Sequence, residues 1–157
     1  MVIYRNKPTG THFRNVDLDL YSKGDLLPLV TALGRKVIVL YVGRERRTYS
    51  AHLELAKVTK TADSTIRAFC ALIEALPKAE RGMWNAAKVR DFNIGVQAAT
   101  QPLSCEFALA AETAKSASKL GARIVFTVYA PEKPHKRNGK GRAGGRSAPS
   151  RRSRVLT

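Results

Sequence analysis

The 157-residue sequence lacks several features, and each absence excludes a class of protein. No apolar run approaches the roughly 18–20 residues that a membrane-spanning helix requires. The N-terminal stretch MVIYRNKPTG has neither a long apolar core nor a small-residue cleavage pattern, so we expect no secretory signal peptide. We therefore expect a soluble protein of the cytoplasm without a membrane partner.

Cysteine is scarce, since Cys70 and Cys105 are the two examples. Both fall on predicted buried faces, which favours free thiols in a reducing compartment over a disulfide between them. The sequence contains no C-x-x-C pair, and His12, His52 and His135 lie far apart in different predicted elements. We therefore predict no metal site and no cofactor.

Acidic residues are too few to balance the basic ones. Twelve Asp and Glu face 28 Lys and Arg, which gives a formal net charge of +16. Residues 131–157 hold nine of the bases and one acid, and they have no large apolar residue before Val155. Such a segment cannot bury enough surface to offset its chain entropy, so we expect a disordered basic tail. It would follow an N-terminal arm (1–11) and a single globular domain (12–130).

Hydrophobic periodicity predicts an α+β domain, with a mixed or antiparallel sheet and helices packed on it. Alternating patterns predict half-buried strands over 15–22, 48–56 and 91–98. Helical patterns cover 23–34, 63–76, 78–89 and 111–121. Residues 104–110 predict a further strand, although the same apolar run could begin a helix. Residues 37–42 and 122–130 are apolar on both faces, so we expect two central strands that are covered on both sides.

An ungapped alignment places Gly34 on Gly121, and each glycine follows a leucine at the end of a predicted helix. In both copies a strand precedes the helix and an apolar strand follows it. The alignment suggests two pseudo-symmetric β-α-β units with the two apolar strands near the middle of the sheet. The alternative is that strand, helix, glycine and strand form a common succession without shared ancestry.

Three stretches carry a resemblance: VDLDLYSKGDLLPLVTALGRKVIVLYVG, AFCALIEALPKAERGMWNAAKVRDFNIGVQA and CEFALAAETAKSASKLGARIVFTVY. Together they resemble a broad bacterial family of uncharacterised domains, over roughly residues 14–130. The resemblance implies an α+β fold and a bacterial origin. It implies no activity, cofactor or catalytic residue, because the shared motifs are structural.

Nucleotide-binding motifs are not supported. GKGRAG (139–144) satisfies G-x-G-x-x-G, but it lies in the predicted tail without the strand and helix that a dinucleotide loop requires. No G-x-x-x-x-G-K-[ST] motif occurs. We therefore expect neither a dinucleotide site nor a P-loop.

Four titratable residues form the strongest candidate for chemistry. Asp17 and Asp19 share the polar face of one predicted strand, and His52 and Glu54 share that of another. If the two strands lie close in one sheet, these groups converge and shift one another's pKa values. The competing interpretation is an ordinary solvated sheet face, which alternating charged residues also produce.

The basic residues concentrate in two places. One is the turn GRERR with Arg44, Arg46 and Arg47, to which Arg35 and Lys36 at the other end of the predicted strand could add. The other is the predicted tail, in which we assign phosphate contacts to the following bases: Arg137, Lys140, Arg142, Arg146, Arg151, Arg152 and Arg154. The alternatives are a solvated turn and a solubilising appendage.

The sequence therefore favours a non-enzymatic binding protein whose basic tail contacts nucleic acid or another polyanion without sequence specificity. An alternative is an immunity-type or regulatory domain that binds a protein through its folded core. A third hypothesis is a small enzyme that uses Asp17, Asp19, His52 and Glu54. The strands could also pair across a dimer axis, but the sequence does not indicate which sheet edge is free.

Overall fold

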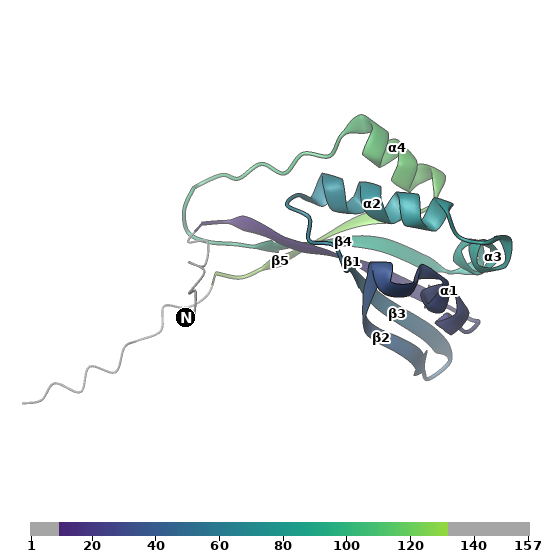
Figure 1. Ribbon diagram of the computed structural model, residues 1–157. Coiled ribbons are helices and arrows are strands. Elements are labelled where there is room, and N and C mark those ends of the chain that lie inside the picture. Colours follow the sequence, from purple (N-terminus) through teal and green to yellow (C-terminus); the bar gives the residue numbers. More distant parts are fainter. Residues whose placement is uncertain (1–9, 132–157) are drawn as a thin grey trace, which may run out of the picture.

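The computed structural model describes residues 10–131, which form five strands and four helices (Figure 1). The strands are β1 (His12–Ser22), β2 (Val37–Glu45), β3 (Thr48–Leu55), β4 (Val89–Gln97) and β5 (Arg123–Tyr129). The helices are α1 (Leu27–Leu33), α2 (Ala62–Glu74), α3 (Lys78–Ala86) and α4 (Ala111–Lys119), and the 3-10 turn η1 (Gly34–Lys36) follows α1. The α+β prediction is confirmed. Residues 132–157 of the predicted tail and 1–9 of the predicted arm lie outside the described residues, and with them the GKGRAG motif and His135.

The five strands form one mixed sheet in the order β2-β3-β1-β4-β5. Neighbouring strands are antiparallel except for β4 and β5, which are parallel. The connection from β1 through α1 to β2 leaves room for β3 between them, and the connection from β3 through α2 and α3 to β4 encloses β1. These two interleaved crossovers are the split β-α-β connectivity of ferredoxin-like domains. Helix α4 and strand β5 add a third crossover at one edge.

The predicted strand over 104–110 is wrong. In the structure residues 98–110 have no regular secondary structure. They connect β4 to α4, and Figure 1 shows this segment rising from the end of β4 to the helix layer. A parallel pair such as β4 and β5 requires a crossover of a dozen or more residues, and this segment provides part of it. The second predicted β-α-β unit therefore uses β4 as its first strand, which the ungapped alignment did not match.

The predicted position of the two apolar strands is also wrong. Strands β2 and β5 lie at the two edges of the sheet, not near its middle. The hairpin between β2 and β3 inserts β3 next to β1, and β4 occupies the other side of β1. Large apolar side chains on both edge strands are consequently exposed, among them Leu40 and Val128.

The hydrophobic core lies between the helices and one face of the sheet. Along β1 the buried residues Val16, Leu18 and Leu20 alternate with half-buried polar ones. Phe69 of α2 stacks on Phe92 of β4, with their ring centroids 5.9 Å apart. Trp84 of α3 is fully buried, and its indole N–H donates to the carbonyl oxygen of Leu120 at 3.0 Å, which joins α3 to the end of α4.

Short polar side chains define where the helices begin. The Asp25 carboxylate accepts the Leu27 N–H at 2.9 Å before α1, and the Thr61 hydroxyl accepts the Ser64 N–H at 3.1 Å at the start of α2. Asp63 accepts the Ala110 N–H at 2.9 Å, which ties the first turn of α2 to the start of α4. None of the helices within residues 10–131 is long and apolar enough to cross a bilayer.

The two cysteines differ from the prediction in one respect. Both are free thiols, but Cys70 is buried in α2 whereas Cys105 is exposed in the irregular segment before α4. The expected burial of Cys105 is wrong because that expectation assumed a strand over 104–110. Burial raises the pKa of the Cys70 thiol to about 11, which keeps it protonated and unreactive at neutral pH.

Two glycines provide a matched test of the backbone. Gly121 ends α4 with a φ of +64°, and a Cβ atom there would lie 3.0 Å from Nη2 of Arg90. Gly82 lies inside α3, and a Cβ atom there would meet no atom within 4 Å. We predict that Gly121→Ala lowers the free energy of unfolding by about 1–2 kcal/mol, whereas Gly82→Ala raises it by about 0.5–1 kcal/mol. Urea denaturation measures both, and equal effects at the two positions would contradict the assignment.

Candidate functional site

The sheet face opposite the helices carries a continuous set of polar side chains. Alternation along β1 directs Asn15, Asp17, Asp19 and Tyr21 to this face, because Val16, Leu18 and Leu20 occupy the core. We call it the open face. The antiparallel register between β1 and β3 pairs Asp19 with His52. Asp17 and Asp19 on β1 therefore lie on a strand next to the one that carries His52 and Glu54.

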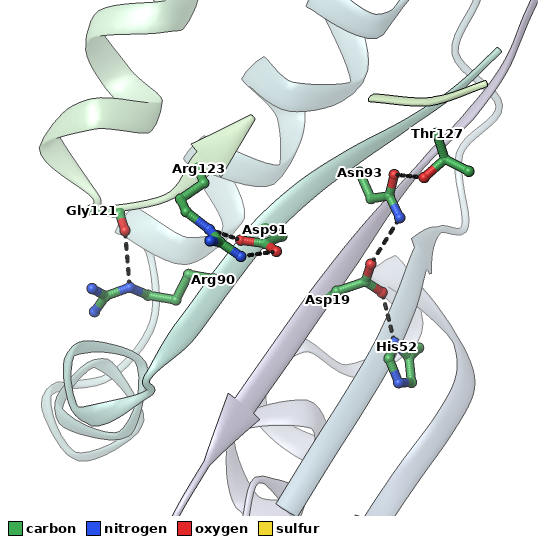
Figure 2. Close-up of polar contacts among 8 residues, drawn as sticks. All are labelled: Asp19, His52, Arg90, Asp91, Asn93, Gly121, Arg123 and Thr127. Atoms are coloured by element: carbon green, nitrogen blue, oxygen red, sulfur yellow. Dashed lines mark hydrogen bonds and ion pairs between the residues drawn. The ribbon is translucent and has the colours of Figure 1, made fainter. Parts of the chain in front are cut away.

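His52 and Asp19 form the closest contact on the open face. Nδ1 of His52 lies 2.6 Å from Oδ1 of Asp19, so the ring N–H donates to the carboxylate (Figure 2). The rings of Tyr21 and Tyr41 lie on either side of His52, with ring centroids 5.6 and 6.1 Å from that of the imidazole. The imidazole is therefore fixed by a carboxylate and two aromatic rings.

The second oxygen of Asp19 continues the network across the sheet. Nδ2 of Asn93 on β4 donates to Oδ2 of Asp19 at 3.1 Å, and the Thr127 hydroxyl on β5 donates to Oδ1 of Asn93 at 2.7 Å. Figure 2 shows these side chains in one line over β3, β1, β4 and β5. The sequence interpretation missed Asn93 and Thr127. The alternation of β4 around Phe92 and Ile94 placed Asn93 on the polar face, but no local signal identified β5 as its neighbour.

Asp17 and Glu54 meet through an amide. The Nδ2 group of Asn15 donates to Oδ1 of Asp17 at 2.8 Å and to Oε1 of Glu54 at 2.7 Å. Burial, followed by the nearby charges of Glu54 and Asp19, raises the pKa of Asp17 from 3.8 to about 6. Asp17, Asp19, His52 and Glu54 therefore converge on the open face, as the sequence predicted.

A further ion pair lies at the start of β5. Arg123 donates from Nε and Nη2 to the two carboxylate oxygens of Asp91, each at 2.7 Å (Figure 2). The neighbouring Arg90 donates to the Gly121 carbonyl oxygen at 3.1 Å and thereby fixes the turn before β5. Arg123 links β5 to β4, and Arg90 links β4 to the turn that precedes β5. Both arginines therefore stabilise the parallel strand pair.

The geometry of the open face matches a structural network better than an active site. Both oxygens of Asp19 are used within the face, by His52 and Asn93. Ser50 lies two residues before His52 on the same strand, but its hydroxyl is buried and has no hydrogen-bond partner, so the bond that a Ser–His–Asp relay requires is not formed. Over residues 10–131, no three His, Cys, Asp or Glu side chains gather as a metal-binding group.

A groove of about 230 Å³ lies beside the Asn15–Glu54 contact. Its walls combine apolar residues such as Phe13 and Leu55 with the charged residues Arg14 and Lys57. The groove contains neither His52 nor Asp19, so it does not bring a substrate to the closest acid and histidine pair.

The basic turn lies at the tip of the β2–β3 hairpin. Arg44, Arg46 and Arg47 are all exposed there, and Arg46 has a φ of +54° in the turn. Nε of Arg44 donates to the Arg46 carbonyl oxygen at 3.1 Å, and its guanidinium carbon lies 5.8 Å from the ring centroid of Tyr49. The bases assigned to phosphate contacts in the predicted tail, from Arg137 to Arg154, lie outside the described residues.

Comparison with known proteins yields no match. No protein-family model, no curated protein and no solved structure matches this chain. The resemblance to uncharacterised bacterial domains therefore stays a prediction.

The raised pKa of Asp17 predicts a pH-dependent stabilisation by Asp17→Asn. Because the folded pKa of about 6 exceeds the unfolded value of 3.8, the wild type loses stability as pH rises between these values and keeps that loss above pH 6. An asparagine does not ionise, so the variant should be more stable than wild type by about 1 kcal/mol at pH 7.5, after allowance for solvent screening. The difference should vanish near pH 4.

Chemical denaturation at pH 4, 5.5 and 7.5 measures this difference. Glu106→Gln is the matched control, since it removes one carboxylate from an exposed position outside the open face. A stability difference for Asp17→Asn that stays constant over this pH range would contradict the assigned pKa.

Proposed function

We propose that the chain is a non-enzymatic binding protein of the bacterial cytoplasm that contacts nucleic acid or another polyanion through its basic residues. The supporting observation is the exposure of Arg44, Arg46 and Arg47 around one hairpin tip of a chain with a formal net charge of +16. Guanidinium groups suit this role because they remain charged and bind phosphate oxygens with two parallel hydrogen bonds.

The distribution of acids restricts where a polyanion would bind. Asp17, Asp19 and Glu54 lie on the open face without an Arg or Lys partner in the described part of the chain. Their charge repels phosphates from this face at short range. Contact is therefore directed to the hairpin tip and to the basic residues of 131–157.

The salt dependence of binding tests this function. We predict that the full chain binds a generic duplex, and that its affinity falls roughly a thousandfold between about 50 and 200 mM salt if six phosphates are neutralised. Deletion of residues 131–157 should remove most of the affinity. The triple variant R44Q/R46Q/R47Q should lower the slope of log affinity against log salt by about 1 for each arginine.

The matched control is K78Q/K115Q/K119Q, which removes the same charge from exposed positions on α3 and α4. Fluorescence anisotropy with a labelled duplex gives all the affinities. Unchanged binding after deletion of 131–157 would rule that segment out, and equal slopes for the two triple variants would rule out the hairpin.

A second candidate function is the binding of a protein partner through the folded domain, in an immunity-type or regulatory role. The specific observation in its favour is the apolar edge strand β2, with Ile38, Val39 and Leu40 exposed. Binding of a protein partner that survives both deletion of 131–157 and R44Q/R46Q/R47Q separates this function from the first, because the apolar β2 edge is retained in that variant.

A further inference from the structure

The outer edge of β2 is an unprotected pairing surface. Its backbone bonds to β3 on one side, and no strand within the described residues lies on the other. Ile38, Val39, Leu40 and Tyr41 are 48, 45, 53 and 38% exposed, although this run is as apolar as a central strand. Edge strands normally carry charged residues or proline that prevent pairing with another chain, and Val37–Gly43 contains neither.

The opposite edge is less free. On β5, Arg123 is held by Asp91, and the Thr127 hydroxyl is bonded to Asn93. The guanidinium group of Arg14 lies over the Tyr129 ring, 4.7 Å from its centroid. Phe126 and Val128 of β5 are also exposed, but Arg123 places a charge on that edge, whereas residues 37–43 carry none. β2 is therefore the stronger candidate for an intermolecular contact.

We propose that β2 pairs with β2 of a second copy of this chain, antiparallel and about a two-fold axis perpendicular to the sheet. Pairing between two identical edges closes after two copies, whereas pairing of β2 with β5 of another copy would continue as a filament. The dimer would contain one ten-stranded sheet, twice the five strands of one copy.

A β-bulge in β2 limits the possible registers. Val39 lies opposite Leu53 on the helix-covered face, whereas Tyr41 lies opposite His52 on the open face, and Leu40 is the extra residue between them. A perpendicular two-fold axis keeps each side chain on its own face, so paired residues must share a face. This condition is met when Val39 faces the partner's Val42 and Ile38 faces the partner's Gly43. Leu40 then faces the partner's Tyr41.

Charge at the strand ends selects this register. Lys36 immediately precedes β2 and would face the partner's Glu45, and symmetry repeats this attraction at the other end. If each residue faced the partner residue two positions earlier, Arg35 would lie opposite the partner's Arg44. If each residue faced the partner residue two positions later, Ile38 would lie opposite the partner's Glu45. Only the register with Val39 opposite the partner's Val42 combines apolar pairs at the centre with opposite charges at both ends.

This inference is independent of polyanion binding. It is an alternative to the second candidate function, because a β2–β2 dimer would occupy the edge that a different protein would bind. The net charge of each copy opposes association, but at 0.15 M salt the Debye length is about 8 Å, which screens exposed charges beyond the contact. Half of that net charge, +8 of +16, lies in residues 132–157, which the structure does not describe.

Sedimentation equilibrium of the full chain tests the dimer. In 0.15 M salt, and between about 1 and 100 μM protein, we expect a monomer–dimer equilibrium for the wild type. Val39→Lys should shift the dissociation constant at least about a hundredfold towards monomer, because it places a charge in the apolar centre of the contact. Val128→Lys is the matched control on β5, where the side chain is 63% exposed, and it should leave the equilibrium unchanged.

A charge exchange tests the register. Lys36→Glu and Glu45→Lys should each weaken the dimer about tenfold, since each turns two attractive pairs into repulsive ones. The double variant K36E/E45K should restore the wild-type constant, which a merely structural effect of either substitution would not do. Far-UV circular dichroism verifies that every variant is folded.

A monomer throughout this concentration range would overturn the dimer. A dimer that Val39→Lys does not affect would overturn the β2 contact, and a double variant as weak as the single ones would overturn the register. A monomeric chain that still binds a different protein after deletion of 131–157 would overturn the dimer and leave the second candidate function standing.

Discussion

The interaction on which the rest of the structure depends is the packing of the helices on one face of the sheet. Leu18 and Leu20 of β1, Phe69 of α2 and Trp84 of α3 are fully buried in this interface. Because a single helix layer covers a single face, the other face must satisfy its own polar groups. The edge strands β2 and β5 are covered by neither layer, so they contact solvent or another chain. The open-face network and the exposed apolar edges are thus consequences of one packing arrangement.

The open face meets this requirement with hydrogen bonds between side chains of different strands. Asp19 receives donors from β3 and β4, and Asn15 joins the carboxylates of Asp17 and Glu54. Burial, together with the charges of Glu54 and Asp19, raises the pKa of Asp17. Within residues 10–131 no Arg or Lys forms an ion pair with Asp17, Asp19 or Glu54. This imbalance explains why we place polyanion contacts at the Arg44–Arg47 hairpin tip and not on the sheet.

The sequence predicted most elements but not their neighbours. Alternation identified β1, β3 and β4, and the convergence of Asp19 with His52 was anticipated because each had a defined face. Periodicity reports which residues share a face, but it does not report which strands adjoin. It therefore could not distinguish an edge strand such as β2 from a central strand, and it could not connect Asn93 to Thr127. The segment 104–110 was misassigned because an apolar run occurs both in strands and in connecting segments that pack against the core, as Phe107 and Leu109 do.

The exposed edge also gives the apolar pattern of β2 a physical explanation. A strand that is apolar on both faces is usually covered on both. In the proposed dimer the side chains of β2 would instead be shielded laterally by their cross-strand neighbours on the partner's β2. The most direct measurement is amide hydrogen exchange of the full chain as a function of protein concentration. We predict that amides of residues 37–45 which point away from β3 become protected as concentration rises, while β5 amides do not change. Exchange of β2 that is independent of concentration would contradict the account.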